Sequence, residues 1–214
     1  MKIAKYLLSV YEAERLLYHI KPSSPGLYHN CSYEIAHVVA HILNLSFSCG
    51  TVPLQWRQAV VTPVPKVAKP STLSEYRPIS VTPLLSRVAE KIVVSRWILP
   101  AIPAYSIVDQ FAFRPTGRVC ALTFLLHHVT AILERSIYAR CLMIDFSNRV
   151  DHRTLLSKLN KLNLPPHAIN WIISHLRSQI LKCEGQLSAS AEINTSIVQG
   201  SGTGSMLFVV MEVI

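Results

Sequence analysis

The chain contains the stretch Tyr138-Ala-Arg-Cys-Leu-Met-Ile-Asp145, an apolar, β-prone run that ends abruptly in a carboxylate. Runs of this kind are typical of buried strands. An aspartate at the tip of a buried strand needs a cation, a backbone cap or a metal ion to offset its desolvation. The next residues, Phe146 to His152, are compatible with all three. The stretch therefore predicts a buried strand that ends in a structural or a functional aspartate.

Size and charge set the limits for the rest of the chain. Its 214 residues fit one domain, which could bury roughly 70% of the surface of the unfolded chain. The formal net charge of +9 favours polyanionic partners such as nucleic acid or an acidic membrane. The mean hydropathy of +0.31 is high for a small soluble protein. It indicates either a large core or apolar surface that another element should cover.

Cysteine usage and apolar tracts bear on the cellular compartment. The five cysteines are widely spaced and form no Cys-x-x-Cys pair, which favours a reducing compartment over a disulfide scaffold. The apolar run near Met1 is shorter than that of a signal peptide. The tracts Ile92–Ala104 and Cys120–Leu133 are too short and too polar to span a bilayer. Cytosol or nucleus is favoured over secretion. We expect no membrane partner, and the sequence does not indicate a particular protein partner.

Upstream of the strand, a helix is predicted from Tyr33 to Cys49, where apolar residues recur at helical spacing and Gly50 closes the pattern. His37 and His41 stand four residues apart and share one face of this helix. A metal-binding protein built on this pair is one functional alternative. The pair has no third ligand at a recognisable spacing, so ordinary histidines are favoured.

A strand that runs into an extended loop is predicted from Val52 to Lys66. Basic residues then follow with few acidic ones between them. They form either a solvated basic face or a surface that tracks phosphates; they are Lys66, Lys69, Arg77, Arg87, Lys91 and Arg96.

The remaining chain alternates helical and extended patterns. Helices are predicted at Pro83–Ile98, Arg118–Ile137, Asp151–Leu162 and through Trp171 to Leu176, and strands at Ile180–Cys183 and Ala191–Val198. The glycine-rich turn Gln199-Gly-Ser-Gly-Thr-Gly-Ser205 then opens a helix from Met206 to Met211. Such a turn is either a flexible linker or a place where a phosphate or a base pair approaches the backbone.

Six blocks, taken together and in order, resemble the reverse transcriptase domain of non-LTR (LINE-type) retrotransposons. The resemblance covers roughly residues 34–210. The blocks are Val64-Pro-Lys66, Glu75-Tyr-Arg-Pro-Ile-Ser80, Asp109-Gln-Phe-Ala-Phe-Arg-Pro-Thr-Gly117, Met143-Ile-Asp-Phe-Ser147, Asp151-His-Arg-Thr-Leu-Leu156 and Gln199-Gly-Ser-Gly-Thr-Gly204.

This resemblance implies an α+β (mixed α/β) fold that is part of a right-hand polymerase. Residues 1–33 would be an N-terminal helical and loop segment, residues 34–135 the fingers and residues 136–214 an incomplete palm, with the thumb absent. The implied reaction is RNA-directed DNA synthesis with an RNA template, a DNA primer and a dNTP. Its two Mg²⁺ ions would lie about 3.5–4 Å apart and prefer hard oxygen ligands.

The resemblance also assigns roles to single residues. Asp145 matches the catalytic, metal-binding carboxylate of the palm strand. Lys66 and Arg77 match finger positions that meet the triphosphate or the template backbone. Gln110 and Arg114 match a block that lines the template. The loop that sits against the nascent base pair is matched by Gln199, Gly200 and Ser201.

The sequence departs from the family pattern in three places. The loop after Asp145 is three residues short, which would rotate the following helix by about 300° and shift it by about 4.5 Å. If the gap falls after Asp151, Val150 becomes the candidate steric gate; if it falls earlier, that position is absent. The paired-aspartate motif that should follow the Gln-Gly-Ser block is not found, and an early Gly-x-Asp-Gly-like loop is not recognisable at Lys21–Cys31.

These departures predict that the 214 residues do not polymerise DNA, because Asp145 alone with substrate phosphates holds Mg²⁺ only weakly. We also expect uncovered apolar surface and strand edges, and hence poor solubility. The alternative function is a non-catalytic nucleic-acid-binding remnant that uses the basic fingers.

Overall fold

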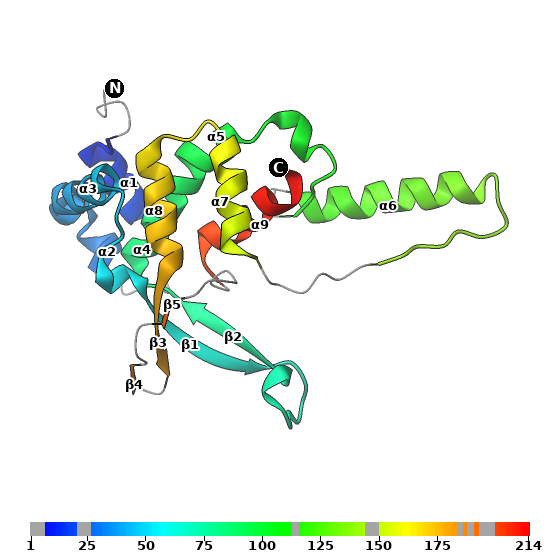
Figure 1. The fold of residues 1–214 in the computed structure, drawn as a ribbon, viewed down its shortest axis with the longest axis horizontal. Helices are drawn as coiled ribbons and strands as arrows, with labels where there is room; N and C mark the ends of the chain where they lie inside the picture. The colour runs from blue at the N-terminus through cyan, green and yellow to red at the C-terminus, as the bar shows by residue number, and fades with distance from the viewer. Residues whose placement is uncertain are drawn as a thin grey trace.

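The computed structural model describes residues 7–20, 27–112, 116–143, 150–183, 186–187, 191–192 and 200–214. In Figure 1 these residues form a helical body, with a twisted sheet on one side and the long helix α6 projecting from another. One buried core connects the body, and it draws on residues from Leu8 near the start of the chain to Val210 near its end.

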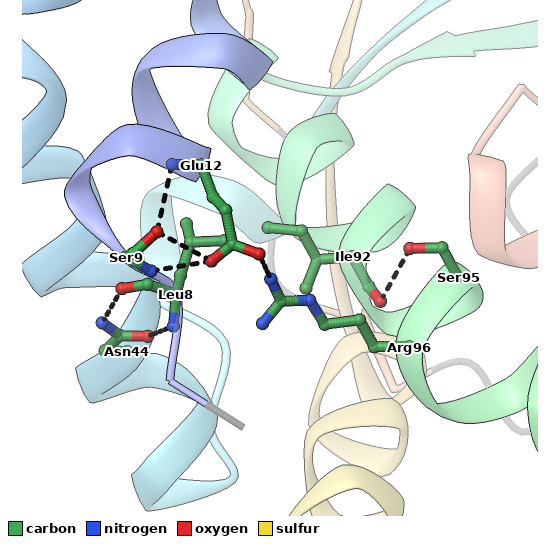
Figure 2. A network of polar contacts seen from close by, with 7 residues as sticks. All are labelled: Leu8, Ser9, Glu12, Asn44, Ile92, Ser95 and Arg96. Atoms are coloured by element: carbon green, nitrogen blue, oxygen red, sulfur yellow. Dashed lines mark hydrogen bonds and ion pairs between the residues drawn. The ribbon is translucent and has the colours of Figure 1, made fainter. Parts of the chain in front are cut away.

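The N-terminal helix α1 (Val10–Tyr18) packs on helix α3 (Ser32–Cys49), with the short helix α2 (Leu27–Asn30) between them in the chain. Helix α3 confirms the helix predicted from Tyr33 to Cys49. It ends at Gly50, whose φ of 61° is in the left-handed region where glycine carries no steric penalty. The Asn44 side chain fixes the chain before α1, because it accepts a hydrogen bond from Leu8 N (2.6 Å) and donates one to Leu8 O (2.9 Å) (Figure 2).

A mixed sheet forms beside the helices. After a 3₁₀ turn (Leu54–Arg57), strand β1 (Gln58–Pro65) pairs antiparallel with β2 (Tyr76–Val81), and a second 3₁₀ turn (Leu73–Glu75) precedes β2. Strand β3 (Ser178–Cys183) pairs parallel with β1 on its other side. The short strands β4 (Gln186–Leu187) and β5 (Ala191–Glu192) both pair antiparallel with β3. The predicted strands at Ile180–Cys183 and at the start of Ala191–Val198 are confirmed, whereas residues 193–198 lie outside the described part.

The core lies between helices from distant parts of the chain. Helix α4 (Leu84–Val93) continues as a π-helical turn (Val94–Ile98) into α5 (Leu99–Ala101), and a 3₁₀ turn (Ala104–Ile107) follows. Helices α7 (His152–Lys161), α8 (Pro166–Arg177) and α9 (Gly202–Val213) complete the body. The ring of Phe47 on α3 meets Trp97 at 5.0 Å and Trp171 on α8 at 5.9 Å between centroids. These aromatic contacts join the two halves of the sequence.

Helix α6 (Gly117–Leu133) differs from the other long helices because Gly117 is its one buried residue. Large apolar side chains are exposed along its length, among them Leu122 (57% exposed) and Leu126 (56%). Figure 1 shows the helix extending away from the body, and the described residues 134–143 that follow it form no helix or strand. The helix predicted from Arg118 to Ile137 is therefore confirmed up to Leu133, but its apolar residues do not enter the core.

The prediction of a buried strand at Tyr138–Asp145 is wrong for the residues that the structure describes. Residues 138–143 have no strand pairing, and Leu142 and Met143 are 84% and 86% exposed. A strand requires a partner for its backbone N–H and C=O groups. In the described structure, strands β1 to β5 pair with one another and not with this segment. Apolar, β-prone composition alone does not supply that partner. Asp145 itself lies outside the described residues.

Among the helices that the structure describes, none has the length and apolarity required to cross a membrane.

Candidate functional site

The first part of the candidate site is the hairpin formed by β1 and β2. Val64 pairs with Arg77 across the hairpin, so these two side chains share a face. Lys66 directly follows β1, and its N–H donates to Glu75 O at 2.7 Å, which extends the pairing by one residue. Lys66 and Arg77 are both exposed. The hairpin therefore presents two exposed cations close to its tip, a charge that suits phosphate binding.

The loop at the hairpin tip is held by its own polar groups. The Glu75 carboxylate accepts hydrogen bonds from Ser71 N (2.5 Å) and Thr72 N (3.0 Å), and the bond from Ser71 is the largest cause that lowers the pKa of Glu75. Lys66 Nζ donates to Ser74 O at 2.7 Å. The Glu75 carboxylate stays ionised, but Lys66, Lys69 and Arg77 outnumber it, so the net charge of the hairpin tip is positive.

The second part is the corner at Gly200 and Ser201, where the chain enters α9. Gly200 has a φ of 106° and a methyl group in place of its hydrogen would lie 2.6 Å from Ser80 O. Ser80 is on β2, three residues after Arg77, so the structure brings the glycine-rich turn against the basic hairpin. Ser201 is buried and caps α9, because its Oγ accepts a hydrogen bond from Gly204 N at 2.9 Å.

A buried carboxylate on α4 holds the first turn of α9. Glu90 is fully buried, and its Oε2 accepts hydrogen bonds from Thr203 N and Thr203 Oγ1, both at 3.1 Å. Ser86 Oγ donates to the other carboxylate oxygen, Oε1, at 3.4 Å. Glu90 is not among the residues predicted from the sequence. The available signal was an acidic residue within the apolar helical stripe that includes Val93 and Trp97.

His175 on α8 completes this buried cluster. Its Nε2 lies 3.9 Å from Glu90 Oε1, and its ring stacks on Trp171 with 5.4 Å between centroids. Burial lowers the pKa of His175, and the attraction of Glu90 opposes that shift only in part. The imidazole is therefore neutral near pH 7. Trp171 Nε1 in turn donates to Ser46 Oγ on α3 at 3.0 Å, so four helices meet at this point.

The structure separates Arg96 from the other basic residues of the predicted phosphate-tracking surface. Its guanidinium forms an ion pair with Glu12 on α1, and Figure 2 shows the side chain turned toward that helix. Glu12 also accepts from Ser9 N at 2.9 Å, and this backbone hydrogen bond is the largest cause that lowers its pKa. Arg96 thus ties α1 to the π-helical turn after α4. Arg87 and Lys91 remain exposed.

The other sequence-predicted residues are placed as follows. Gln110 lies between the 3₁₀ turn Ala104–Ile107 and α6, and its Oε1 accepts a hydrogen bond from Ala112 N at 3.0 Å. Val150, the candidate steric gate, is a core residue with 4% of its surface exposed. Its role in sugar discrimination stays a prediction. Arg114, Asp145 and Gln199 lie outside the described residues.

The described residues do not provide a donor set for a metal ion. Within them, no group of three or more His, Cys, Asp or Glu side chains is arranged to hold one. His37 and His41, the pair behind the metal-binding alternative, are both exposed on α3. Because Asp145 is not among the described residues, its role as a ligand of Mg²⁺ stays a prediction.

Comparison with known proteins finds related polymerases. The chain is 28% identical over 182 residues to the RNA-directed DNA polymerase from mobile element jockey of Drosophila melanogaster, which covers 79% of this chain and 19% of that protein. It is 27% identical over 200 residues to the probable RNA-directed DNA polymerase from transposon BS of the same species, covering 86% of this chain and 22% of the relative.

A third relative is the probable RNA-directed DNA polymerase from transposon X-element, also of Drosophila melanogaster, with 27% identity over 165 residues, 73% of this chain and 18% of the relative. No family model matches the chain. The chain spans about a fifth of the length of these relatives. The resemblance to reverse transcriptases of non-LTR retrotransposons that the six blocks indicate is confirmed.

Proposed function

We propose, from this similarity, that the chain is part of an RNA-directed DNA polymerase of a non-LTR retrotransposon, made of fingers (about residues 34–135) and part of a palm (about residues 136–214). In this proposal the β1–β2 hairpin and the Gly200–Ser201 corner form one surface for template, primer and incoming dNTP. The observation that carries it is the contact of Gly200 with Ser80, which joins two separate family blocks in space.

The hairpin would bind phosphates through two different side chains. Arg77 can donate two parallel hydrogen bonds to a phosphate, whereas Lys66 acts as a compact point charge. Because both lie near the tip of the same hairpin, one phosphate group or two neighbouring ones would meet both cations. The corner offers backbone at close range, because Gly200 has no side chain to keep a base pair away. These properties suit a site that accepts any base sequence while it holds the sugar-phosphate chain.

In the implied reaction, bound Mg²⁺ would supply the positive charge that activates a primer 3′-hydroxyl and offsets the charge of the triphosphate. Asp145 is the residue that we propose to contribute a ligand. The 214 residues contain no Asp-Asp dipeptide. We therefore propose that these residues by themselves bind nucleic acid without extending a primer. Template-directed extension above background by the purified 214-residue chain would overturn this part of the proposal.

Binding is best tested with a labelled RNA template annealed to a DNA primer, measured by fluorescence anisotropy over a range of salt concentrations. In the Lys66→Met, Arg77→Met double variant, we expect weaker binding. The slope of the logarithm of the binding constant against the logarithm of the salt concentration should be smaller by about one for each phosphate contact removed. The control is Lys161→Met, which removes the same type of charge at the end of α7, away from the hairpin (Figure 1). A salt dependence equal in wild type and double variant would overturn the hairpin assignment.

The exposed cations of the hairpin also favour a second candidate, a nucleic-acid-binding module that has no nucleotide site. The same assay separates the two. A polymerase-derived surface should bind the template-primer more tightly when the complementary dNTP and Mg²⁺ are added, whereas a simple binding module should not respond to the identity of the nucleotide.

A further inference from the structure

Glu90 is a carboxylate with no exposed surface in the middle of an apolar helix face. Burial of an ionised carboxylate is strongly unfavourable unless hydrogen-bond donors surround it. Its donors come from two elements: Ser86 on its own helix, and both the N–H and the hydroxyl of Thr203 on α9. Two of the three hydrogen bonds therefore join α4 to the first turn of α9.

The first turn of α9 favours a negative charge at this position. The N–H groups there have no partner within the helix, and the aligned peptide dipoles add a partial positive charge. Ser201 Oγ accepts from Gly204 N, while Glu90 takes the N–H of Thr203. Gly202 lies directly against the carboxylate, since a methyl group on it would be 3.8 Å from Glu90 Oε2. Glu90 thus fixes both the axial position and the rotation of the start of α9.

The corner that precedes α9 is held from a second side by β2. Gly200 lies so close to Ser80 O that only a residue without a side chain fits. With α9 fixed on α4 by Glu90, the chain enters the helix along a path that places Gly200 against β2 of the hairpin. A change in the position of Thr203 is therefore expected to move Gly200 relative to Arg77, because only Ser201 and Gly202 separate Thr203 from Gly200 and Gly200 lies against Ser80 of β2.

We propose that Glu90 is a positioning residue that holds the Gly200–Ser201 corner in register with the β1–β2 hairpin, so that both parts of the template-primer surface act together. This inference rests on the proposed function, which places the nascent base pair at the corner. Glu90 contacts no nucleic acid itself. It acts through Thr203, and its partners on the other side are Ser86 and His175.

The substitution Glu90→Gln tests this role with little change in size. A glutamine has one acceptor oxygen and a donor NH₂ group, so it cannot accept at both oxygens, from Thr203 on one and from Ser86 on the other. The negative charge that the helix start favours is also lost. The control is Glu34→Gln, which removes the same charge from an exposed position on α3.

A glycine-selective NMR spectrum reports on the corner directly. The chain has seven glycines, so a ¹⁵N-glycine label yields few signals, and three of them are Gly200, Gly202 and Gly204. In Glu90→Gln these three amide signals should move before nucleic acid is added, and the other glycines should not. Template-primer binding should weaken by about fivefold, the low end of coupling between two parts of one site. The salt dependence set by Lys66 and Arg77 should be unchanged.

The outcomes separate this inference from the function it rests on. A wild-type chain that binds no template-primer overturns the proposed function and the positioning role with it. A wild-type chain that binds, together with a Glu90→Gln chain that has the same affinity and the same glycine signals, overturns the positioning role alone.

If Glu90→Gln does not fold, the variant Thr203→Val tests the positioning role of Glu90 instead. It removes the hydroxyl donor to Glu90 Oε2 and keeps the backbone N–H and the shape of the side chain. The expected result is a smaller shift of the same three glycine signals with weaker binding. Unchanged signals and affinity in Thr203→Val would overturn the inference.

Discussion

A methyl group placed on Gly200 would lie 2.6 Å from the carbonyl oxygen of Ser80, closer than non-bonded carbon and oxygen atoms approach one another. The two residues are far apart in the sequence, one at the entry to α9 and the other on β2. Their contact fixes the distance between the glycine-rich turn and the basic hairpin. It also makes Gly200 a residue at which even a methyl group should have a large effect.

We predict that Gly200→Ala lowers the free energy of unfolding by about 1–3 kcal/mol, the range for a strained non-glycine backbone at positive φ. Displacement of β2 by the methyl group should weaken template-primer binding as well. Chemical denaturation measures the first effect and anisotropy the second. The matched control is Gly202→Ala, where the new methyl group would meet Glu90 at an ordinary distance of 3.8 Å. Equal stability of the two variants would contradict the prediction.

His175 predicts how stability depends on pH. Burial lowers the pKa of His175 in the folded chain below the value of 6.5 for an unperturbed histidine. As the pH falls below that value, the unfolded chain binds a proton that the folded chain does not, so the folded state loses stability by up to about 1.4 kcal/mol per pH unit. His167, whose pKa is also lowered by burial, adds to the effect.

The variant His175→Gln removes one group that binds a proton in the unfolded chain but not in the folded chain. We expect its free energy of unfolding to fall less steeply than that of the wild type between pH 6.5 and pH 5, as measured by urea denaturation at several pH values. Identical slopes for the two chains would show that His175 binds a proton equally well in the folded and unfolded states, contrary to the lowered pKa that its burial implies.

The capping box of α1 predicts a local loss of stability. Ser9 Oγ accepts from Glu12 N at 3.2 Å, and Glu12 Oε2 accepts from Ser9 N at 2.9 Å. The substitution Ser9→Ala should therefore cost about 1 kcal/mol. A double-mutant cycle of Glu12→Gln and Arg96→Met should give a coupling energy no larger than about 1 kcal/mol, because both side chains are partly in contact with solvent. A larger coupling energy would mean that the ion pair of Glu12 and Arg96 supplies most of the free energy that holds α1 on the body.

The exposed apolar residues of α6 predict self-association. Leu122 and Leu126 are four residues apart and so share one face of the helix. Replacing both with glutamate should reduce the association seen by sedimentation velocity at increasing concentration, since large exposed apolar patches promote it. Stability should change by no more than about 0.5 kcal/mol, as is usual for surface positions. A wild-type chain that is monomeric at every concentration would refute this prediction.

Much of the helical structure was predictable because local signals and tertiary packing agree. The helix that ends at Gly50 combines apolar spacing with a residue that tolerates a positive φ. The helix from His152 begins where Asp151 caps it, with Asp151 Oδ2 accepting from Thr154 N at 3.0 Å. In both cases the terminating or capping residue is adjacent in sequence, so the pattern contains the information that sets the helix boundary.

The failures arise where structure depends on partners distant in the sequence. The run Tyr138–Met143 has strand composition, but pairing is decided by which strands reach it, and the described sheet does not. Arg96 counts as a basic residue in the sequence, yet its role follows from Glu12, which belongs to another helix. The importance of Glu90 is not visible in the sequence, because only the fold shows that Thr203 meets it. Gly200 was singled out from its glycine-rich turn and its role in binding stays a prediction, whereas its neighbour Ser80 is visible only in three dimensions.

The parallel pairing of β1 with β3 affects how the protein folds while the ribosome synthesises it. The hydrogen bond from Val52 N to Ser174 Oγ, just before these strands, joins positions 122 residues apart. At the usual rate of synthesis, roughly 6–24 s pass between the translation of β1 and the translation of β3. During that interval one edge of the nascent hairpin is unpaired, and a chaperone or a premature contact with another polypeptide could reach it first.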